Sequence, residues 1–99
     1  MSEKRRGPRQ VSSHDLEVAW GDAGGVLHRI RAICVDVSEG GMRLKSTVKL
    51  PLHENVHFKF KKIRFSGTAR IRQVTWRGTY YIFGAEFTGG LKWRDAARD

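Results

Sequence analysis

Two short stretches carry side chains suited to binding a nucleotide, and the first is RRGPR at positions 5–9. A guanidinium fork matches both the O6/N7 edge of guanine and phosphate oxygens, and its plane stacks on a base. Two arginines on one segment, Arg5 and Arg9, are therefore able to clamp a guanine dinucleotide, with Gly7 and Pro8 shaping the bend between them. The alternative interpretation of the stretch is a solvated basic tail.

The second stretch is DVSEGG at positions 36–41. A carboxylate such as Asp36 accepts hydrogen bonds from N1 and N2 of guanine, while the Ser38 hydroxyl and exposed amides bond phosphate or sugar. Gly41 lets the backbone approach closely. The alternative is an ordinary hairpin turn, in which Asp36 and Ser38 bond local amides and Gly40 or Gly41 takes a positive φ.

The sequence offers no convincing catalytic or metal site. The string HENVH at 53–57 matches the zinc-protease pattern, but that chemistry needs a helix that places His53 and His57 one turn apart. Pro51 precedes the string and a strand pattern follows it, and in extended structure four residues span about 13 Å. No nucleophile elbow or phosphate-binding glycine loop is present. We expect a protein that is not an enzyme and uses no cofactor or metal.

Composition and charge predict one small folded domain with anionic partners. The chain has 99 residues, with 19 Lys and Arg against 10 Asp and Glu, a net charge of +9. The single cysteine, Cys34, excludes an intramolecular disulfide and lies in an apolar run, which predicts an inert, buried thiol in a reducing compartment. No run of about 18 apolar residues is present, so we expect a soluble cytoplasmic protein without a membrane segment.

The elements that must position these stretches are β-strands. Apolar residues alternate with polar ones from Leu16 to Trp20, and Val56, Phe58 and Phe60 alternate with cations. Further extended runs cover 26–37, 42–50, 63–76 with a bulge before Val74, and 80–87, separated by turns at 21–25, 38–41, near 62 and at 77–79. About six strands with short turns favour a small antiparallel barrel or sandwich.

The two ends of the chain differ from this pattern. Residues 1–10 carry a charge of +3 and no apolar pattern, so they are expected to form a flexible arm ahead of a single domain at 11–99. The segment LKWRDAARD at 91–99 predicts a short tail or a turn or two of helix, anchored by Trp93.

The motifs together resemble those of the PilZ domain family. RRGPR is similar to the family's RxxxR motif, DVSEGG to its D/N-x-S-x-x-G motif, and YYIFGAEF at 80–87 to its G-x-E-F-type closing strand. The resemblance implies a six-stranded antiparallel β-barrel that binds the bacterial second messenger cyclic di-GMP. It also implies an arm that is mobile without ligand and folds over the bound nucleotide.

The resemblance implies a binding site made from the arm and the turn. Carried over by position, Arg5 and Arg9 contact guanine and phosphate, and Asp36 and Ser38 bind the base edge and nearby polar atoms. Lys4 directly precedes the arm motif, and its long cation reaches a second phosphate layer, which favours a stacked pair of nucleotides. The expected nucleotide-binding residues are Lys4, Arg5, Arg6, Arg9, Asp36, Ser38, Gly40 and Gly41.

The sequence is compatible with three functions. The leading hypothesis is a non-enzymatic cyclic di-GMP receptor whose ordered arm is recognised by a downstream effector protein. The alternative is a basic barrel that binds RNA or single-stranded DNA through KFKKIR and the rings of Trp20, Trp76, Tyr80 and Tyr81. Against it, the lysines are expected to form a solvated strand face and the rings to form the core. The third is a protein-contact module that binds no nucleotide.

Overall fold

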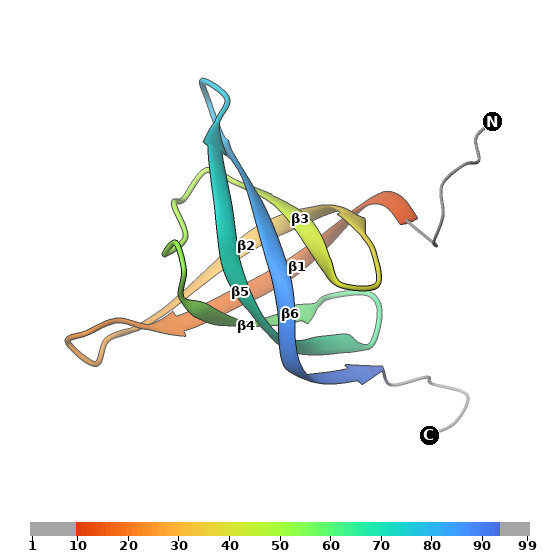
Figure 1. The fold of residues 1–99 in the computed structure, drawn as a ribbon, viewed down its shortest axis with the longest axis horizontal. Coiled ribbons are helices and arrows are strands. Elements are labelled where there is room, and N and C mark those ends of the chain that lie inside the picture. Colours follow the sequence, from red (N-terminus) through yellow and green to blue (C-terminus); the bar gives the residue numbers. More distant parts are fainter. Residues whose placement is uncertain (1–9, 94–99) are drawn as a thin grey trace.

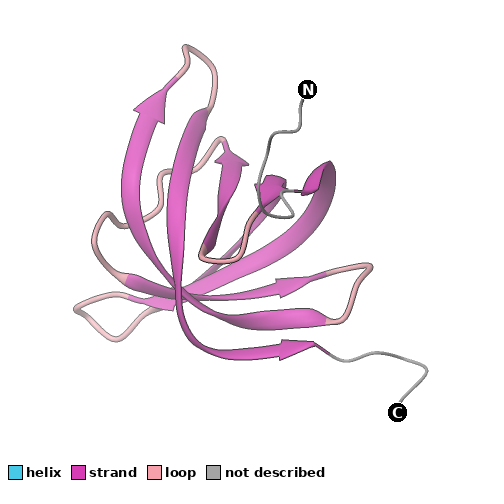
Figure 2. Ribbon diagram, turned by 45° about the vertical axis from the view of Figure 1, so that its right-hand side comes forward, coloured by secondary structure: helices cyan, strands magenta, loops and turns pink. Residues whose placement is uncertain are grey.

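Residues 10–93 are described by the computed structural model, and they form six antiparallel strands closed into a barrel (Figure 1). Figure 2 shows that strands and connecting loops account for the whole described part, with no helix in it. Each strand is hydrogen-bonded to two neighbours in the order β1-β2-β3-β6-β5-β4, so the described strands present no free edge. The strands are β1 (Gln10–Gly21), β2 (Leu27–Val37), β3 (Gly41–Ser46), β4 (Asn55–Phe60), β5 (Phe65–Trp76) and β6 (Tyr81–Trp93).

The alternation in the sequence correctly predicts which side chains point into the barrel. In β4, Val56, Phe58 and Phe60 are buried, and the residues between them are exposed. Phe83 and Ala85 of β6 are likewise buried, with Phe87 packed against the core. Because a strand alternates its side chains between two faces, one set fills the interior and the other meets solvent.

The core is a continuous apolar cluster inside the barrel. Phe58, Phe60, Phe65 and Phe87 form one group of rings with centroids 5.3–6.0 Å apart, in edge, tilted and stacked arrangements. The largest fully buried side chains are Phe83, Leu16, Leu44, Leu50, Ile71, Val18, Val56 and Cys34. The expectation that the tryptophans belong to the core is wrong for Trp76, which is 54% exposed on the β5–β6 hairpin. Trp20 is only partly buried against the cluster.

Strand pairing fixes which loops share an end of the barrel. β1 runs antiparallel to both β2 and β4, so the turn after β2 and the turn after β4 lie at the same end as the start of β1. The β1–β2 and β5–β6 hairpin turns extend from the barrel in other directions (Figure 1). The candidate site residues of the β2–β3 turn therefore lie at the end where β1 enters the sheet.

The limits of the strands depart from the sequence prediction in three places. β1 begins at Gln10, although the alternation starts only near Leu16, and a register shift between Val11 and His14 interrupts it. β3 ends at Ser46 and does not continue to Leu50. β6 continues through Trp93, so the prediction of a tail or helix from Leu91 is wrong for its first three residues.

The bend that permits this extension of β6 is at two glycines. Gly89 and Gly90 have φ of 150° and 59°, and the register of β6 against β5 shifts around Thr68. Glycine adopts positive φ without steric cost, so the strand turns there and then resumes pairing with Phe65 and Ser66. The bulge expected before Val74 is confirmed by a register shift between Ile71 and Gln73.

The described residues contain no helix of the length and apolar character that a membrane crossing requires.

Candidate functional site

A surface hollow of about 250 Å³ lies at the β2–β3 turn. It brings together four residues that the sequence singled out: Asp36, Ser38, Gly40 and Gly41. The opposite wall comes from β5 and β6, which are distant in sequence and reach the turn through pairing of β3 with β6. The remaining lining residues are Met42, Arg43, Arg72, Gln73, Gly84, Ala85 and Glu86.

Asp36 is a nearly buried carboxylate held in position by an arginine. It is 5% exposed, near the end of β2. Arg43 Nε donates to Asp36 Oδ2 at 2.9 Å and Arg43 Nη2 donates to the same oxygen at 2.6 Å. These hydrogen bonds are the larger cause of a raised pKa for Arg43, and the negative charge of the Asp36 carboxylate is the second cause. Since the Arg43 side chain is 57% exposed, the pair joins a buried acceptor to a cation on the rim of the hollow.

Ser38 closes the turn through its backbone. Its amide donates to the Gly41 carbonyl at 2.8 Å, and its hydroxyl donates to the same oxygen at 3.4 Å. The next strand anchors the turn as well, because the Phe87 amide donates to the Gly40 carbonyl at 2.9 Å. The turn is thus tied both to itself and to β6, which gives its polar groups a fixed orientation.

Gly41 is required by close packing and not by an unusual backbone angle. A Cβ built on Gly41 would collide with the carbonyl oxygen of Ala85, whereas one built on Gly40 would meet nothing within 4 Å. The expectation that Gly40 or Gly41 takes a positive φ is wrong, since neither is among the described glycines with positive φ. The sequence interpretation assigned Gly41 a close approach of the backbone to a ligand; the neighbour that the structure shows at Gly41 is the backbone of β6.

Three charged residues of the hollow were missed by the sequence interpretation. Arg43 lies two residues after the glycine pair, and Arg72 and Glu86 face each other from β5 and β6 with Nε and Oε1 3.5 Å apart. Arg43 was recognisable as a polar residue on the outward face of an extended run. Glu86 lies in the G-x-E-F stretch, which was interpreted only as a closing strand, and Arg72 lies in no motif; cross-strand register brings both to the turn.

The start of β1 lies beside Asp36. In the register of β1 against β2, Val11 pairs with Asp36 and Gln10 pairs with Val37. The chain therefore enters the barrel at the edge of the β2–β3 turn. The expected site residues Lys4, Arg5, Arg6 and Arg9 lie outside the described residues.

Cys34 supports the turn from within the core. It is 2% exposed, as predicted, and its thiol donates to the Asp36 carbonyl at 3.3 Å. Burial, followed by the nearby Asp36 charge, raises the pKa of Cys34 to about 11. The side chain therefore acts as a neutral packing group and a weak hydrogen-bond donor at neutral pH.

The histidines of HENVH lie in extended and loop structure. His57 is an outward-facing residue of β4, and His53 precedes that strand with a φ of 67°. Within residues 10–93 no three His, Cys, Asp or Glu side chains are grouped to hold a metal ion.

Comparison with protein families gives one match that spans nearly the whole chain. The model of the PilZ domain matches residues 3–95, a range that includes the arm motif, the β2–β3 turn and all six strands. A search of curated proteins found no match.

Proposed function

Because the chain belongs to the PilZ domain family, we propose that it is a non-enzymatic cytoplasmic receptor for cyclic di-GMP that needs no metal or cofactor. The RxxxR arm and the D-x-S-x-x-G turn hold the nucleotide between them. Ordering of the arm creates a surface that a downstream effector protein recognises.

The observation that carries the proposal is the register of β1 against β2. Gln10 pairs with Val37; in the sequence, Arg9 directly precedes Gln10 and Ser38 directly follows Val37. Arg5 is five residues before Gln10, and an extended chain of that length reaches about 17 Å. Both arginines are thus within reach of a ligand in the hollow of about 250 Å³ beside Asp36.

The chemistry of the hollow suits a guanine. Asp36 offers a carboxylate to the N1 and N2 donors of the base, and Arg43 fixes its orientation through two hydrogen bonds. Arg43 and Arg72 add positive charge at the rim, where a phosphate lies close to exposed guanidinium groups. Gly41 and Gly84 have no side chains, so backbone forms part of the floor.

In this mechanism the arm supplies the affinity and the signal. Arg5 and Arg9 contact guanine and phosphate by charge-assisted hydrogen bonds and stacking, while Lys4 reaches a second nucleotide stacked on the first. Ordering the arm costs conformational entropy, which those contacts offset only when the ligand is present. The conformation of the arm thereby depends on the concentration of cyclic di-GMP.

The test is isothermal titration of the protein with cyclic di-GMP, with GTP and oligothymidylate as control ligands and with a chelator present. We expect saturable binding of cyclic di-GMP at two nucleotides per chain. Arg9→Ala and Asp36→Ala each remove charge-assisted hydrogen bonds and are expected to weaken binding by about tenfold to a hundredfold.

Arg77→Ala is the matched control, since it removes an arginine from the β5–β6 turn and leaves both motifs intact. Far-UV circular dichroism and the unfolding midpoint verify that each variant is folded. Absence of cyclic di-GMP binding by the folded wild-type protein would refute the receptor function, and selective binding of the oligonucleotide would support the nucleic-acid alternative. One nucleotide per chain would refute only the stacked pair.

A further inference from the structure

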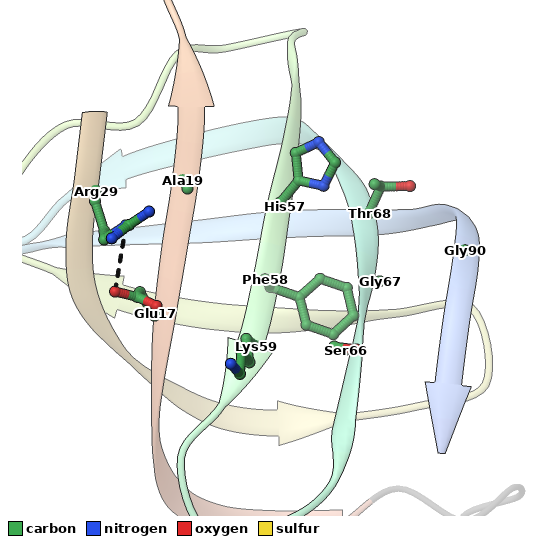
Figure 3. Close-up of a pocket in the computed structure, with 10 residues that line it drawn as sticks. All are labelled: Glu17, Ala19, Arg29, His57, Phe58, Lys59, Ser66, Gly67, Thr68 and Gly90. Atoms are coloured by element: carbon green, nitrogen blue, oxygen red, sulfur yellow. Dashed lines mark ion pairs between the residues drawn. The ribbon is translucent and has the colours of Figure 1, made fainter. Parts of the chain in front are cut away.

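A second feature of the surface is a cationic groove on the outward face of β4 and its neighbours. Two depressions of about 560 and 430 Å³ adjoin there and share Lys59 and Ser66 as lining residues. Figure 3 shows the larger one, with His57 and Lys59 along β4. We call this feature the β4 groove; its polar lining consists of Glu17, Arg29, His57, Lys59, Lys61, Lys62, Arg64, Ser66 and Thr68.

The charge of the β4 groove is almost all positive. Glu17 is its only lining carboxylate among the described residues, and it is already paired with Arg29, whose Nε lies 3.5 Å from Glu17 Oε2. Figure 3 shows this pair across β1 and β2. The ion pairs that join described residues do not include Lys59, Lys61, Lys62 or Arg64. The groove therefore has a local excess of cations available to an anionic partner.

Small residues keep the groove open. Ala19 and Gly67 lie on its floor and Gly90 at its side, as Figure 3 shows. A Cβ built on Gly67 would come within 2.7 Å of Leu91 Cδ2 and 3.0 Å of Leu91 Cα, so a larger residue at that position would require the Leu91 side chain to move. Ala19, Gly67 and Gly90 thus add little or no side chain to the lining of the β4 groove.

We propose that the β4 groove docks an extended acidic segment of a partner protein. The closed barrel presents no free strand edge among the described strands, so a segment that docks on the barrel wall contacts side chains and does not add a strand. His57 and Lys59 project outward from β4 two positions apart, about 6.8 Å along the strand, and Lys61 and Lys62 follow in the bend after Phe60. An extended peptide laid along β4 has the same two-residue repeat, so its carboxylates at alternate positions meet Lys59 and then the lysines of the bend.

The groove suits carboxylates better than single-stranded nucleic acid. Binding of single strands depends on base stacking against exposed rings, together with backbone charge. The aromatic rings of β4, Phe58 and Phe60, are 2% and 4% exposed and point into the core. Trp76 is exposed but ends β5, ten residues from Ser66 and about 33 Å along an extended strand. Among the side chains that the structure describes, the groove thus combines cations and hydroxyls without a stacking platform.

The β4 groove shares no lining residue with the hollow at Asp36. Docking of an acidic segment can therefore be tested separately from nucleotide binding, and failure of one does not imply failure of the other. The inference goes beyond the receptor function because it assigns a contact surface separate from the arm and the chemistry of the segment that binds there.

The test measures fluorescence anisotropy of a labelled peptide of alternating glutamate and glycine, added to the full chain at low and physiological ionic strength. The groove variant is Lys59→Glu/Lys61→Glu/Lys62→Glu. The matched control is Lys45→Glu/Lys49→Glu/Arg77→Glu, which changes the net charge equally at positions outside the groove. A peptide of alternating glutamine and glycine and oligothymidylate serve as control probes.

We expect the acidic peptide to bind the wild-type chain and to lose about tenfold or more in affinity in the groove variant, with little change in the control variant. Both variants should retain cyclic di-GMP binding and a cooperative unfolding transition; a Lys→Gln triple variant replaces the groove variant if the latter does not fold. Equal losses in the two variants would show that net charge alone attracts the peptide and would overturn the proposal. The proposal would also be overturned if the acidic peptide did not bind the wild-type chain. Preferential binding of oligothymidylate that is lost in the groove variant would overturn it as well.

Discussion

Replacement of Gly41 by alanine tests whether close packing between the β2–β3 turn and β6 holds the candidate site together. An alanine Cβ at this position would collide with the Ala85 carbonyl, so Gly41 and β6 must separate. Gly41 pairs with Glu86 at the end of the β3–β6 ladder, so the separation of the two strands would begin at this pair.

The expected magnitude follows from two opposing effects. Overpacking of a close contact costs about 1–3 kcal/mol, whereas exchanging glycine for alanine reduces the entropy of the unfolded chain and returns about 0.4–1 kcal/mol. The free energy of unfolding is thus expected to fall by about 1–2 kcal/mol. In a domain of this size, each 1 kcal/mol lowers the melting temperature by about 4–8 °C.

Gly40→Ala is the matched control for this prediction. The neighbouring glycine has open space around its Cβ position and no positive φ, so alanine there is expected to leave stability unchanged or raise it slightly. Urea unfolding monitored by tryptophan fluorescence gives the urea concentration at the unfolding midpoint for both variants. If the dependence of the unfolding free energy on urea concentration is unchanged, both variants unfold as the wild type does. Equal stability losses in the two variants would refute the steric argument, because an added Cβ collides with β6 at Gly41 and not at Gly40.

Three further predictions concern other parts of the barrel. Because burial raises the pKa of Cys34 to about 11, iodoacetamide should label the native protein slowly at pH 8 and label the urea-unfolded chain quickly, as measured by mass spectrometry; rapid native labelling would contradict this. The side-chain hydrogen bond from His28 and the Val26 amide lower the pKa of Asp22. A carboxyl group whose pKa is lower in the folded state stabilises the fold at pH values above its ordinary pKa. This stabilisation is lost as the pH falls through the pKa of the group in the folded protein. The difference in unfolding free energy between wild type and Asp22→Asn should therefore shrink on acidification below pH 4, and a constant difference would exclude this linkage. Phe83 is 0% exposed, so Phe83→Ala should cost about 3–5 kcal/mol by urea unfolding, and a loss under 1 kcal/mol would mean that the core collapses around the cavity.

Period-two alternation made the buried faces of the strands predictable, whereas strand ends were not. The inward orientation of Val56, Phe58 and Phe60 is predictable, because each is separated from the next by one polar residue. Gln10 begins β1 in a polar stretch with a register shift, where no alternation exists to recognise. The last predicted strand ended at Phe87, but the positive φ values of Gly89 and Gly90 bend β6 and let it continue to Trp93.

The candidate site was predictable to the extent that it is local in sequence. Asp36, Ser38 and Gly41 occur in one short motif, and the structure brings them to one hollow. Glu86 reaches it through the pairing of β6 with β3 and Arg72 through the pairing of β5 with β6, and a short motif does not encode such long-range contacts. The role of Gly41 was missed for the same reason, because the Ala85 carbonyl that excludes a side chain lies on another strand.

The β1–β2 hairpin brings Gln10, the residue that follows the RRGPR motif in the sequence, to the edge of the barrel at which the DVSEGG motif begins. From His14 to Gly21 the strands pair in one register, in which Ser12 would stand opposite Asp36 if it continued. The shift between Val11 and His14 places Val11 opposite Asp36 instead. Since side chains alternate with a period of two, a shift of one residue changes which residues of the incoming chain meet the β2–β3 turn. The bulge in β1 is therefore as much a part of the proposed nucleotide site as the motif residues, because it sets the residue at which the arm joins the sheet.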